Sequence, residues 1–287
     1  MSETSEGLRR KIDGAAELES VVRTMKALAA SSIAQYERAV MSLDEYYRTV
    51  ELGLVACLRQ DDTALHLPVQ PTTTVAVVFG SDQGLVGQFN EVLADFVVNE
   101  LKGMQGNRHI LAVGERISGF DVAARFELPN SVAAITQLIG RVLVEVDALR
   151  GAEVYLFHNR PKPGAVYEPV MQRLLPLDDV WRRDLARVPW PDKNLPEVVG
   201  GSRASLKALI REYLFISLFR ACAESLASEN ASRLAAMRRA EKNIDELLEE
   251  LNQDFHHLRQ TSIDEELFDV IAGYELLSQS GASQSDY

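Results

Sequence analysis

One glycine-containing segment of the chain has the residue types and the position of a phosphate-binding loop. The segment Gly80–Asn90 reads G-S-D-Q-G-L-V-G-Q-F-N and follows a β-branched run at Val75–Phe79. Backbone N–H groups at the start of a helix attract anions, so a loop between a strand and a helix is a place where phosphate binds. The glycine spacing matches neither the P-loop nor the dinucleotide fingerprint. The segment therefore favours a structural strand-to-helix turn over a nucleotide site.

No other group of residues has the spacing of a catalytic or metal-binding site. The adjacent residues His256 and His257 would point about 100° apart on a helix, so they do not form a metal-ligand pair. The acidic runs Glu246–Glu250 and Asp264–Glu266 are typical of solvated helix faces. Ser81 lies outside a nucleophile elbow. We therefore expect no catalytic residue, no bound metal and no cofactor.

Composition indicates a soluble globular protein. The 287 residues are 46% hydrophobic and 25% charged, with a formal net charge of −12. This acidic balance disfavours nucleic acid as a partner, because no segment is basic enough to neutralise a phosphate backbone. We find no apolar run long enough to span a bilayer and no secretory signal at the start. Cys57 and Cys222 are expected to be reduced thiols.

Proline and glycine divide the chain into three parts. All 10 prolines lie between Pro68 and Pro196, and none of the 17 glycines falls between Ser202 and Ala272. Both residues disfavour helix interiors. The sequence therefore predicts two long helices, over about residues 8–58 and 202–272, around a middle segment that is rich in helix breakers.

Apolar residues in both predicted helices alternate steps of four and three, which keeps one seam facing a partner helix. The predicted seam residues are Leu18, Val22, Met25 and Ala29, then Tyr36, Val40, Leu43, Tyr47, Val50 and Leu54, and at the other end Ile244, Leu248, Leu251, Phe255 and Leu258. The pattern predicts a long coiled coil of the two ends.

The middle of the chain reads as strands and helices in alternation, which predicts a largely parallel sheet covered on both faces. Strands are predicted at 75–79, 109–113, 153–158 and 165–175, helices at 86–101 and 131–149 with Asn130 or Ser131 as cap, a turn at 159–164, and a return linker at 181–196. The predicted fold class is α+β: a long antiparallel coiled coil with an inserted α/β (Rossmann-like) domain. The predicted domains are residues 1–60 (helix), 70–196 (α/β), 200–277 (helix) and 278–287 (flexible tail).

The residues alone leave two classes of function open. One is a mechanical or scaffolding subunit, whose long coiled coil exposes surface for other proteins. The other is a nucleotide-binding α/β enzyme with a helical extension. The missing glycine fingerprint and the length of the last helix favour the first class.

Several segments resemble the gamma subunit of F-type rotary ATP synthases. Leu8–Ile12 and Val22–Ser31 look like the opening helix of that family, and Ser81–Asn90 is similar to its S-D-R-G-L-C-G-x-x-N motif. Glu224–Met237 and Leu258–Leu267 carry the most specific match. The opening helix also looks like the alternate, N-type branch of these enzymes.

The resemblance implies a rotor shaft without catalysis of its own. It implies alpha and beta subunits as a hexameric partner, an epsilon subunit and a ring of c subunits, with the membrane contacted only through that ring. The expected location is peripheral, at the cytoplasmic face of the cell membrane. Rotation would couple ion flow to ATP synthesis or hydrolysis in the hexamer.

The resemblance also implies partner contacts at Met25, Arg233, Arg259 and Gln260. A guanidinium suits bidentate pairing with a carboxylate on a partner loop. Gln83 and Val86 stand where the family motif has arginine and cysteine, so any role of those two family side chains is not carried over.

Overall fold

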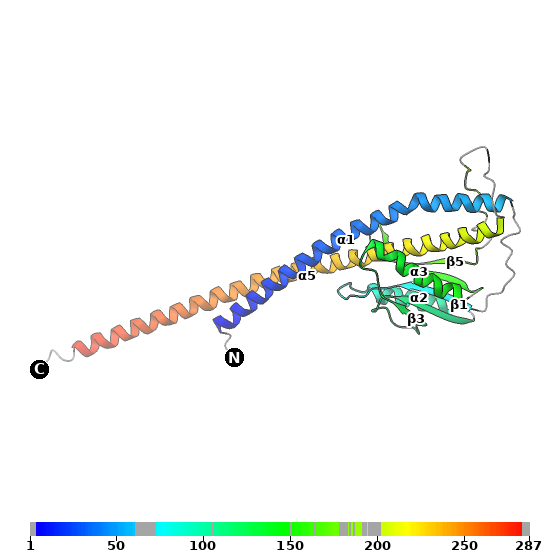
Figure 1. Ribbon diagram of the computed structural model, residues 1–287. Helices are drawn as coiled ribbons and strands as arrows, with labels where there is room; N and C mark the ends of the chain where they lie inside the picture. Colours follow the sequence, from blue (N-terminus) through cyan, green and yellow to red (C-terminus); the bar gives the residue numbers. More distant parts are fainter. Residues whose placement is uncertain are drawn as a thin grey trace. The chain divides into compact units, whose positions relative to one another are not determined.

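The computed structural model describes residues 4–60, 73–104, 106–149, 151–163, 165–177, 183, 185, 187–190, 194 and 202–282. Figure 1 shows its elements, most of them labelled. They are α1 (Ser5–Gln60), β1 (Thr73–Phe79), α2 (Phe89–Lys102), β2 (Asn107–Val113), β3 (Ala124–Phe126), α3 (Val132–Ala148), β4 (Glu153–Lys162), β5 (Ala165–Leu175) and α5 (Ser202–Ala282). The predicted α+β class, with terminal helices around a central sheet, is confirmed.

The two terminal helices follow the map of proline and glycine. Helix α1 has 56 residues and α5 has 81, and neither contains a proline. Helix α5 continues through residues 278–282, part of the stretch expected to be a flexible tail. Residues 283–287 lie outside the described residues, as does most of the expected linker at 181–196.

The sheet has five strands in the order β3-β2-β1-β4-β5. Strands β1 to β4 run parallel, and β5 pairs antiparallel with β4 as the second arm of a hairpin. Crossover connections through α2 and α3 allow this parallel core. The loops that follow β1, β2 and β3 therefore meet at one edge of the sheet, the carboxyl edge.

Alternate strand residues divide the core into two layers. Val75, Val77 and Phe79 of β1 pack in a cluster with α1, α3 and α5. Ala76 and Val78, which point to the other face, pack against α2. Because both faces are covered, the strands read as continuous apolar runs. The prediction of a largely parallel sheet covered on both faces is confirmed.

The chain forms two compact units, whose boundaries fall inside α1 and α5. The terminal unit comprises residues 1–27 and 237–287, and the central unit comprises residues 28–236. In the terminal unit, Leu8, Ala15 and Leu251 form a small core, to which Ile12, Leu248, Phe255 and Leu258 add. Lys26 of α1 pairs with Glu241 of α5 in the same unit.

Within the central unit, α1 and α5 pack in opposite directions. Asp44 lies 3.3 Å from Arg220, and the Tyr46 hydroxyl donates to Glu212 at 2.7 Å. Residue numbers rise along α1 as they fall along α5, which is the antiparallel order that was predicted. The predicted seam from Tyr36 to Leu54 packs in the main core.

Three local predictions need correction, and one strand was missed. Leu18 is 59% exposed, so it is not a seam residue. Strand β3 was not predicted, because three residues are too short to show an alternating pattern. Residues 159–162, predicted as a turn, extend β4. Ser131 stands at the N-cap of α3 but makes no side-chain capping hydrogen bond.

Two further findings concern the whole described chain. Cys57 and Cys222 are free and buried, and burial raises the pKa of both thiols. Among the described residues, we find no helix with the length and apolarity of a membrane span.

Candidate functional site: the glycine loop and α5

The segment that resembles a phosphate loop is closed by its own side chains. We call Gly80–Gln88 the glycine loop. The backbone N–H of Ser81 donates to the Asn90 side chain at 3.0 Å, and the Asn90 amide donates back to the Ser81 hydroxyl at 2.8 Å. The Ser81 hydroxyl in turn donates to the Gln83 carbonyl at 3.1 Å. These buried polar groups satisfy one another, so the loop has a fixed shape.

Asp82 places a carboxylate at the carboxyl edge of the sheet. Its Oδ1 accepts from the N–H of Glu115, after β2, at 2.8 Å, and its Oδ2 accepts from the N–H of Leu128, after β3, at 2.9 Å. In open α/β sheets this edge is where ligands bind. Here the chain supplies the anion itself. Those two N–H groups are therefore occupied, which disfavours the nucleotide-binding alternative.

Two glycines of the loop stand at positions where a side chain would be sterically unfavourable. A Cβ at Gly80 would lie 2.6 Å from the Ile117 Cβ, so only glycine allows the loops after β1 and β2 to approach so closely. Gly87 has φ +60°, a left-handed conformation that glycine adopts without cost. Leu85 has φ +64° and is the only non-glycine residue with positive φ in the described part of the chain.

Two serines of α5 bind the strand end and the glycine loop. The Ser225 hydroxyl donates to the carbonyl of Phe79 at 3.1 Å, and the Ser232 hydroxyl donates to the carbonyl of Val86 at 2.5 Å. Both hydrogen bonds are buried. Small hydroxyl side chains let α5 approach the sheet while satisfying the carbonyls of Phe79 and Val86. The S-D-Q-G-L-V-G and A-E-S-L-A-S-E-N-A-S-R segments are therefore two sides of one contact.

A buried ion pair lies beside these two serines on α5. Arg233 Nη2 donates to Glu229 Oε1 at 2.5 Å, and the two side chains are only 11% and 7% exposed. Burial raises the pKa of Glu229, and the nearby charge of Asp82 adds to the rise, while Arg233 opposes it. Burial prevails over the ion pair here because both charges have lost most of their hydration.

A second polar chain joins the sheet to both long helices. The ring of His158, on β4, lies with Nε2 2.9 Å from Glu224 Oε2 of α5. Arg220 donates from Nε to Glu224 at 2.9 Å and reaches Asp44 of α1 at 3.3 Å. Burial would raise the pKa of Glu224, but hydrogen bonds from His158 and Arg220 outweigh it and lower the pKa. This carboxylate is therefore held in its ionised form.

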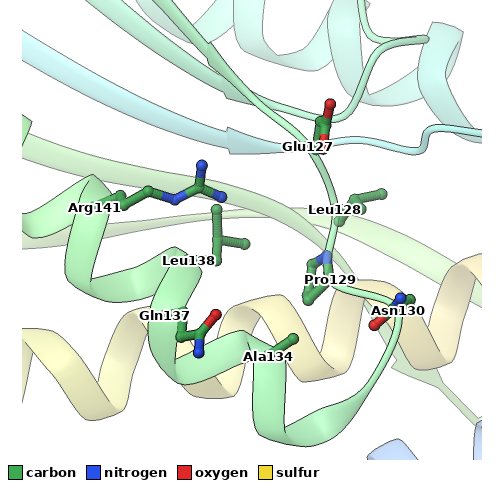
Figure 2. Close-up of a pocket in the computed structure, with 8 residues that line it drawn as sticks. All are labelled: Glu127, Leu128, Pro129, Asn130, Ala134, Gln137, Leu138 and Arg141. Carbon is green, nitrogen blue, oxygen red and sulfur yellow. The ribbon is translucent and has the colours of Figure 1, made fainter.

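A hollow of about 480 Å³ opens at the carboxyl edge of the sheet, beside the segment that follows β3. Figure 2 shows its two sides: Ala134, Gln137, Leu138 and Arg141 come from α3, and residues 127–130 come from the segment after β3. The Arg141 guanidinium lies 5.8 Å from the centre of the Phe126 ring. The walls mix apolar and polar groups, and no group of possible metal ligands occurs among the described residues.

The four predicted contact residues lie in different surroundings. Arg233 is buried beside Glu229 in the central unit. Met25 is half-buried on α1 in the terminal unit, next to Lys26, whose partner is Glu241. Arg259 and Gln260 are exposed neighbours on α5, and Arg259 lies 18 residues beyond Glu241, about 27 Å along a helix. The structure does not bring Met25 to Arg259.

Sequence reasoning missed the residues at the junction where the end of β1 and the glycine loop meet α5. Asp82, Ser225, Ser232 and Glu229 lie inside segments that matched a family, but none was assigned a contact. One signal was available: Ser225, Ser228 and Ser232 follow one another at steps of three and four, so they share one face of the helix. Polar side chains on an apolar helix face need partners inside the protein.

Comparisons with known proteins agree with these features. The family model described as ATP synthase matches residues 4–277. The ATP synthase gamma chain of Nitrosomonas eutropha is 26% identical over 292 residues, covering 94% of this chain and 98% of the relative. That of Salinibacter ruber is 27% identical over 310 residues, covering 96% and 98%.

Solved structures show the same fold. A chain of the Euglena gracilis mitochondrial ATP synthase has a TM-score of 0.65 at 16% identity, covering 99% of this chain and 96% of that one. A chain in the central stalk and c-ring structure of the Tetrahymena thermophila mitochondrial ATP synthase has a TM-score of 0.56 at 21% identity, covering 77% and 99%. With a family match over residues 4–277 and relatives aligned over nearly their whole length, the chain belongs to the ATP synthase gamma chain family.

Proposed function

We propose that this chain is the central rotor shaft of a rotary ATP synthase. Its curated relatives are named ATP synthase gamma chain, and its structural neighbours include chains of a central stalk and a rotor. In this role the chain turns inside a hexamer of alpha and beta subunits. It couples ion-driven rotation of a c ring to ATP synthesis or hydrolysis.

One observation carries the proposal: buried polar contacts hold the α/β body, which comprises β1 to β5 with α2 and α3, to a single continuous helix. Helix α5 runs unbroken from Ser202 to Ala282. Ser225, Ser232 and Glu224 of this helix bind β1, the glycine loop and β4, respectively. A shaft must pass a torque from its body to its helix without slipping. Directional buried hydrogen bonds resist sliding better than a purely apolar contact, whose energy depends little on direction.

Catalysis belongs to the hexamer in this proposal. The N–H groups after β2 and β3 that could receive a phosphate already bind Asp82. The shaft acts by differential contact, because its asymmetric surface stabilises a different conformation in each beta subunit as it turns. The complex interconverts ATP with ADP and phosphate, and this chain contributes the coupling.

We propose Arg259 and Gln260 as direct contacts with the hexamer, since both are exposed on α5. Met25 is proposed as a contact through its half-exposed side chain. Arg233 is carried as a family contact, but its guanidinium is already engaged by Glu229 and Asn230. Its contribution to a partner contact would thus include breaking or sharing that pair.

The remaining partners follow from the same role. We propose that the epsilon subunit and the c ring bind the α/β body, and that the chain is peripheral, at the cytoplasmic face of the cell membrane. The resemblance of the opening helix to the N-type branch suggests that branch for this chain. The coupling ion is decided by c-ring residues.

The proposal is tested by purification of the complex from native membranes in mild detergent, with this chain carrying an affinity tag. We expect alpha, beta and epsilon subunits to co-elute with ATPase activity. Recovery of the 31.9 kDa chain without them would contradict the proposal.

The contact residues are tested in the same complex. Arg259→Ala should weaken coupling between ATP hydrolysis and ion pumping, while the stability of the isolated chain stays within about 0.5 kcal/mol because the side chain is exposed. Arg239→Ala, at another exposed arginine of α5, is the matched control. Equal coupling in the two variants would remove Arg259 from the contact.

A further inference from the structure

One stretch of the terminal unit has no buried residue on either of its helices. We call residues 16–27 of α1 and residues 238–247 of α5 the neck. All of them are half-buried or exposed, whereas Ala15 and Leu251, which lie just outside the neck, are 4% and 8% exposed. No neck residue belongs to a hydrophobic cluster formed by the described residues. Since apolar burial is the main force that joins two helices, apolar contact holds the neck only weakly.

A salt bridge joins the two helices of the neck. Lys26 Nζ lies 2.6 Å from Glu241 Oε1 and 2.5 Å from Oε2, so both carboxylate oxygens accept from one ammonium group. The two side chains are only 31% and 21% exposed, so water weakens their attraction less than that of a fully exposed pair. Lys26 follows Ala15 of the small core by about three turns of α1.

Two further cations of the neck act on the same carboxylate. The hydrogen bond from Lys26 lowers the pKa of Glu241 and outweighs the rise caused by desolvation, and the charges of Arg23 and Arg238 lower the pKa further. Arg23 is itself paired with Glu19, one turn earlier on α1. Residues of both helices therefore keep the Glu241 carboxylate ionised.

The bridge supplies a direction that apolar contact in the neck does not. Hydrophobic contact depends little on direction, so two weakly packed helices can turn or slide against each other. A hydrogen-bonded ion pair holds one residue of α1 opposite one residue of α5, and interhelical ion pairs set the orientation of helices in coiled coils. A shaft of two helices carries torque through both of them only if neither helix moves past the other.

We propose that Lys26 and Glu241 are positioning residues for rotary coupling: their bridge fixes α1 to α5 in the neck, so that both helices turn together under load. This inference rests on the proposed function, because the bridge has this task only in a chain that turns. Neither residue touches the reacting groups. Without the bridge, α1 and α5 shift against each other under load, and ATP hydrolysis continues with fewer ions moved per ATP.

The test measures the ions pumped per ATP hydrolysed by the whole complex in sealed vesicles. Lys26→Gln and Glu241→Gln each break the bridge, and the ratio should fall about twofold or more, because residues in contact are commonly coupled by free energies of that size. ATP hydrolysis should persist. Lys242→Gln is the matched control, since it removes the same charge from the neck while its partner Glu246 lies on the same helix. The control should leave the ratio unchanged.

Restoring the bridge separates its positioning role from a general effect of charge or stability. Lys26→Glu combined with Glu241→Lys inverts the pair and should restore the ratio, and Lys26→Arg should preserve it. A covalent link gives a second measurement. Lys26→Cys with Glu241→Cys is joined in the isolated chain by a short bis-methanethiosulfonate, which the buried Cys57 and Cys222 do not reach. The reassembled complex should pump at the normal ratio until a reductant cleaves the link.

The possible failures are distinguishable. If the unchanged chain does not assemble with alpha and beta subunits into a pumping complex, the proposed function is wrong. If it does, and Lys26→Gln and Glu241→Gln pump at the unchanged ratio, the shaft role stands and the role of the bridge is wrong. If the single variants lose coupling but the covalent link fails to restore it, the two charges act on other groups, and the role of the bridge is again wrong.

Discussion

The hydroxyl of Ser232 on α5 donates to the carbonyl of Val86 in the glycine loop at 2.5 Å, across 146 residues of sequence. Ser225, seven residues earlier on α5, makes the same kind of bond to Phe79, which is seven residues before Val86. The two serines, about two turns apart on α5, therefore bind two carbonyls that are also seven residues apart, one at the end of β1 and one in the glycine loop. The last helix completes the hydrogen bonding of the first strand and of the loop that follows it.

Removal of the Ser232 hydroxyl should destabilise the central unit. Ser232→Ala leaves a buried carbonyl without its donor, and we expect a loss of about 1–3 kcal/mol in the free energy of unfolding. Urea denaturation followed by circular dichroism measures it. Ser262→Ala, at an exposed serine of the same helix, controls for the helix propensity of alanine. Equal losses in the two variants would show that the bond to Val86 contributes nothing.

The buried Glu229 should make stability depend on pH. Burial raises its pKa in the native state, whereas in the unfolded chain a glutamate titrates near its ordinary value of about 4.3. Between those two pKa values the native state holds more protons than the unfolded state. The free energy of unfolding contributed by this group is therefore fully present below pH about 4.3 and falls as pH rises toward the native pKa.

Glu229→Gln removes that contribution. The difference in free energy of unfolding, unchanged chain minus variant, should decrease as the pH is raised from below the ordinary glutamate pKa toward neutrality, as read from urea midpoints across that range. Glu250→Gln, at an exposed glutamate of the same helix, is the matched control. A difference equally steep for Glu250 would contradict burial as the cause.

Two glycine-to-alanine changes should shift stability in opposite directions. Gly80→Ala places a methyl group 2.6 Å from the Ile117 Cβ, and such overpacking costs about 1–3 kcal/mol. Gly140 lies inside α3, and a methyl group added there would meet nothing within 4 Å, so Gly140→Ala should stabilise by about 0.5–1 kcal/mol. Thermal unfolding of both variants measures the two shifts, and a loss of stability at Gly140 would contradict the open space seen there.

The small core of the terminal unit should depend on Leu251. This side chain is 8% exposed and packs with Leu8 and Ala15. Leu251→Asp buries an unpaired charge, and we expect the helices of the unit to separate at a cost of about 2 kcal/mol or more. The loss of helical circular dichroism on heating, together with limited proteolysis, reports it. Leu247→Asp, at a 44% exposed position, should have a far smaller effect.

Much of the fold could be predicted from the sequence because its signals are local and long. The absence of proline from both ends of the chain located three of the four helix ends to within a few residues, while the end of α5 lies ten residues beyond its predicted position. The strand at Ala165–Leu175 was predicted with its observed bounds. Short or ambiguous signals failed. The turn was predicted at 159–164, but residues 159–162 extend β4. Pro161 lies in the part of β4 that only β5 contacts, where proline is tolerated.

The coiled-coil seam shows a different limit. Leu18 was chosen for its type, yet the neighbouring Glu19 is the more buried residue at that level of α1. A spacing of four and three residues can be started on either of two adjacent helix faces, and the apolar residue was taken as the one in the seam. The partners of the junction serines and of Asp82 could not be predicted, since the partners lie far away in sequence and are backbone groups, which leave no side-chain pattern.

The burial of both cysteines has a practical consequence. The thiolate is the form that attacks an alkylating reagent, and at Cys57 and Cys222 the raised pKa keeps the thiolate rare while burial keeps the reagent out. A maleimide dye or bead attached to a cysteine newly introduced at an exposed position should therefore label the native chain there alone. The natural sequence is thus suited to single-molecule recording without prior removal of its own thiols.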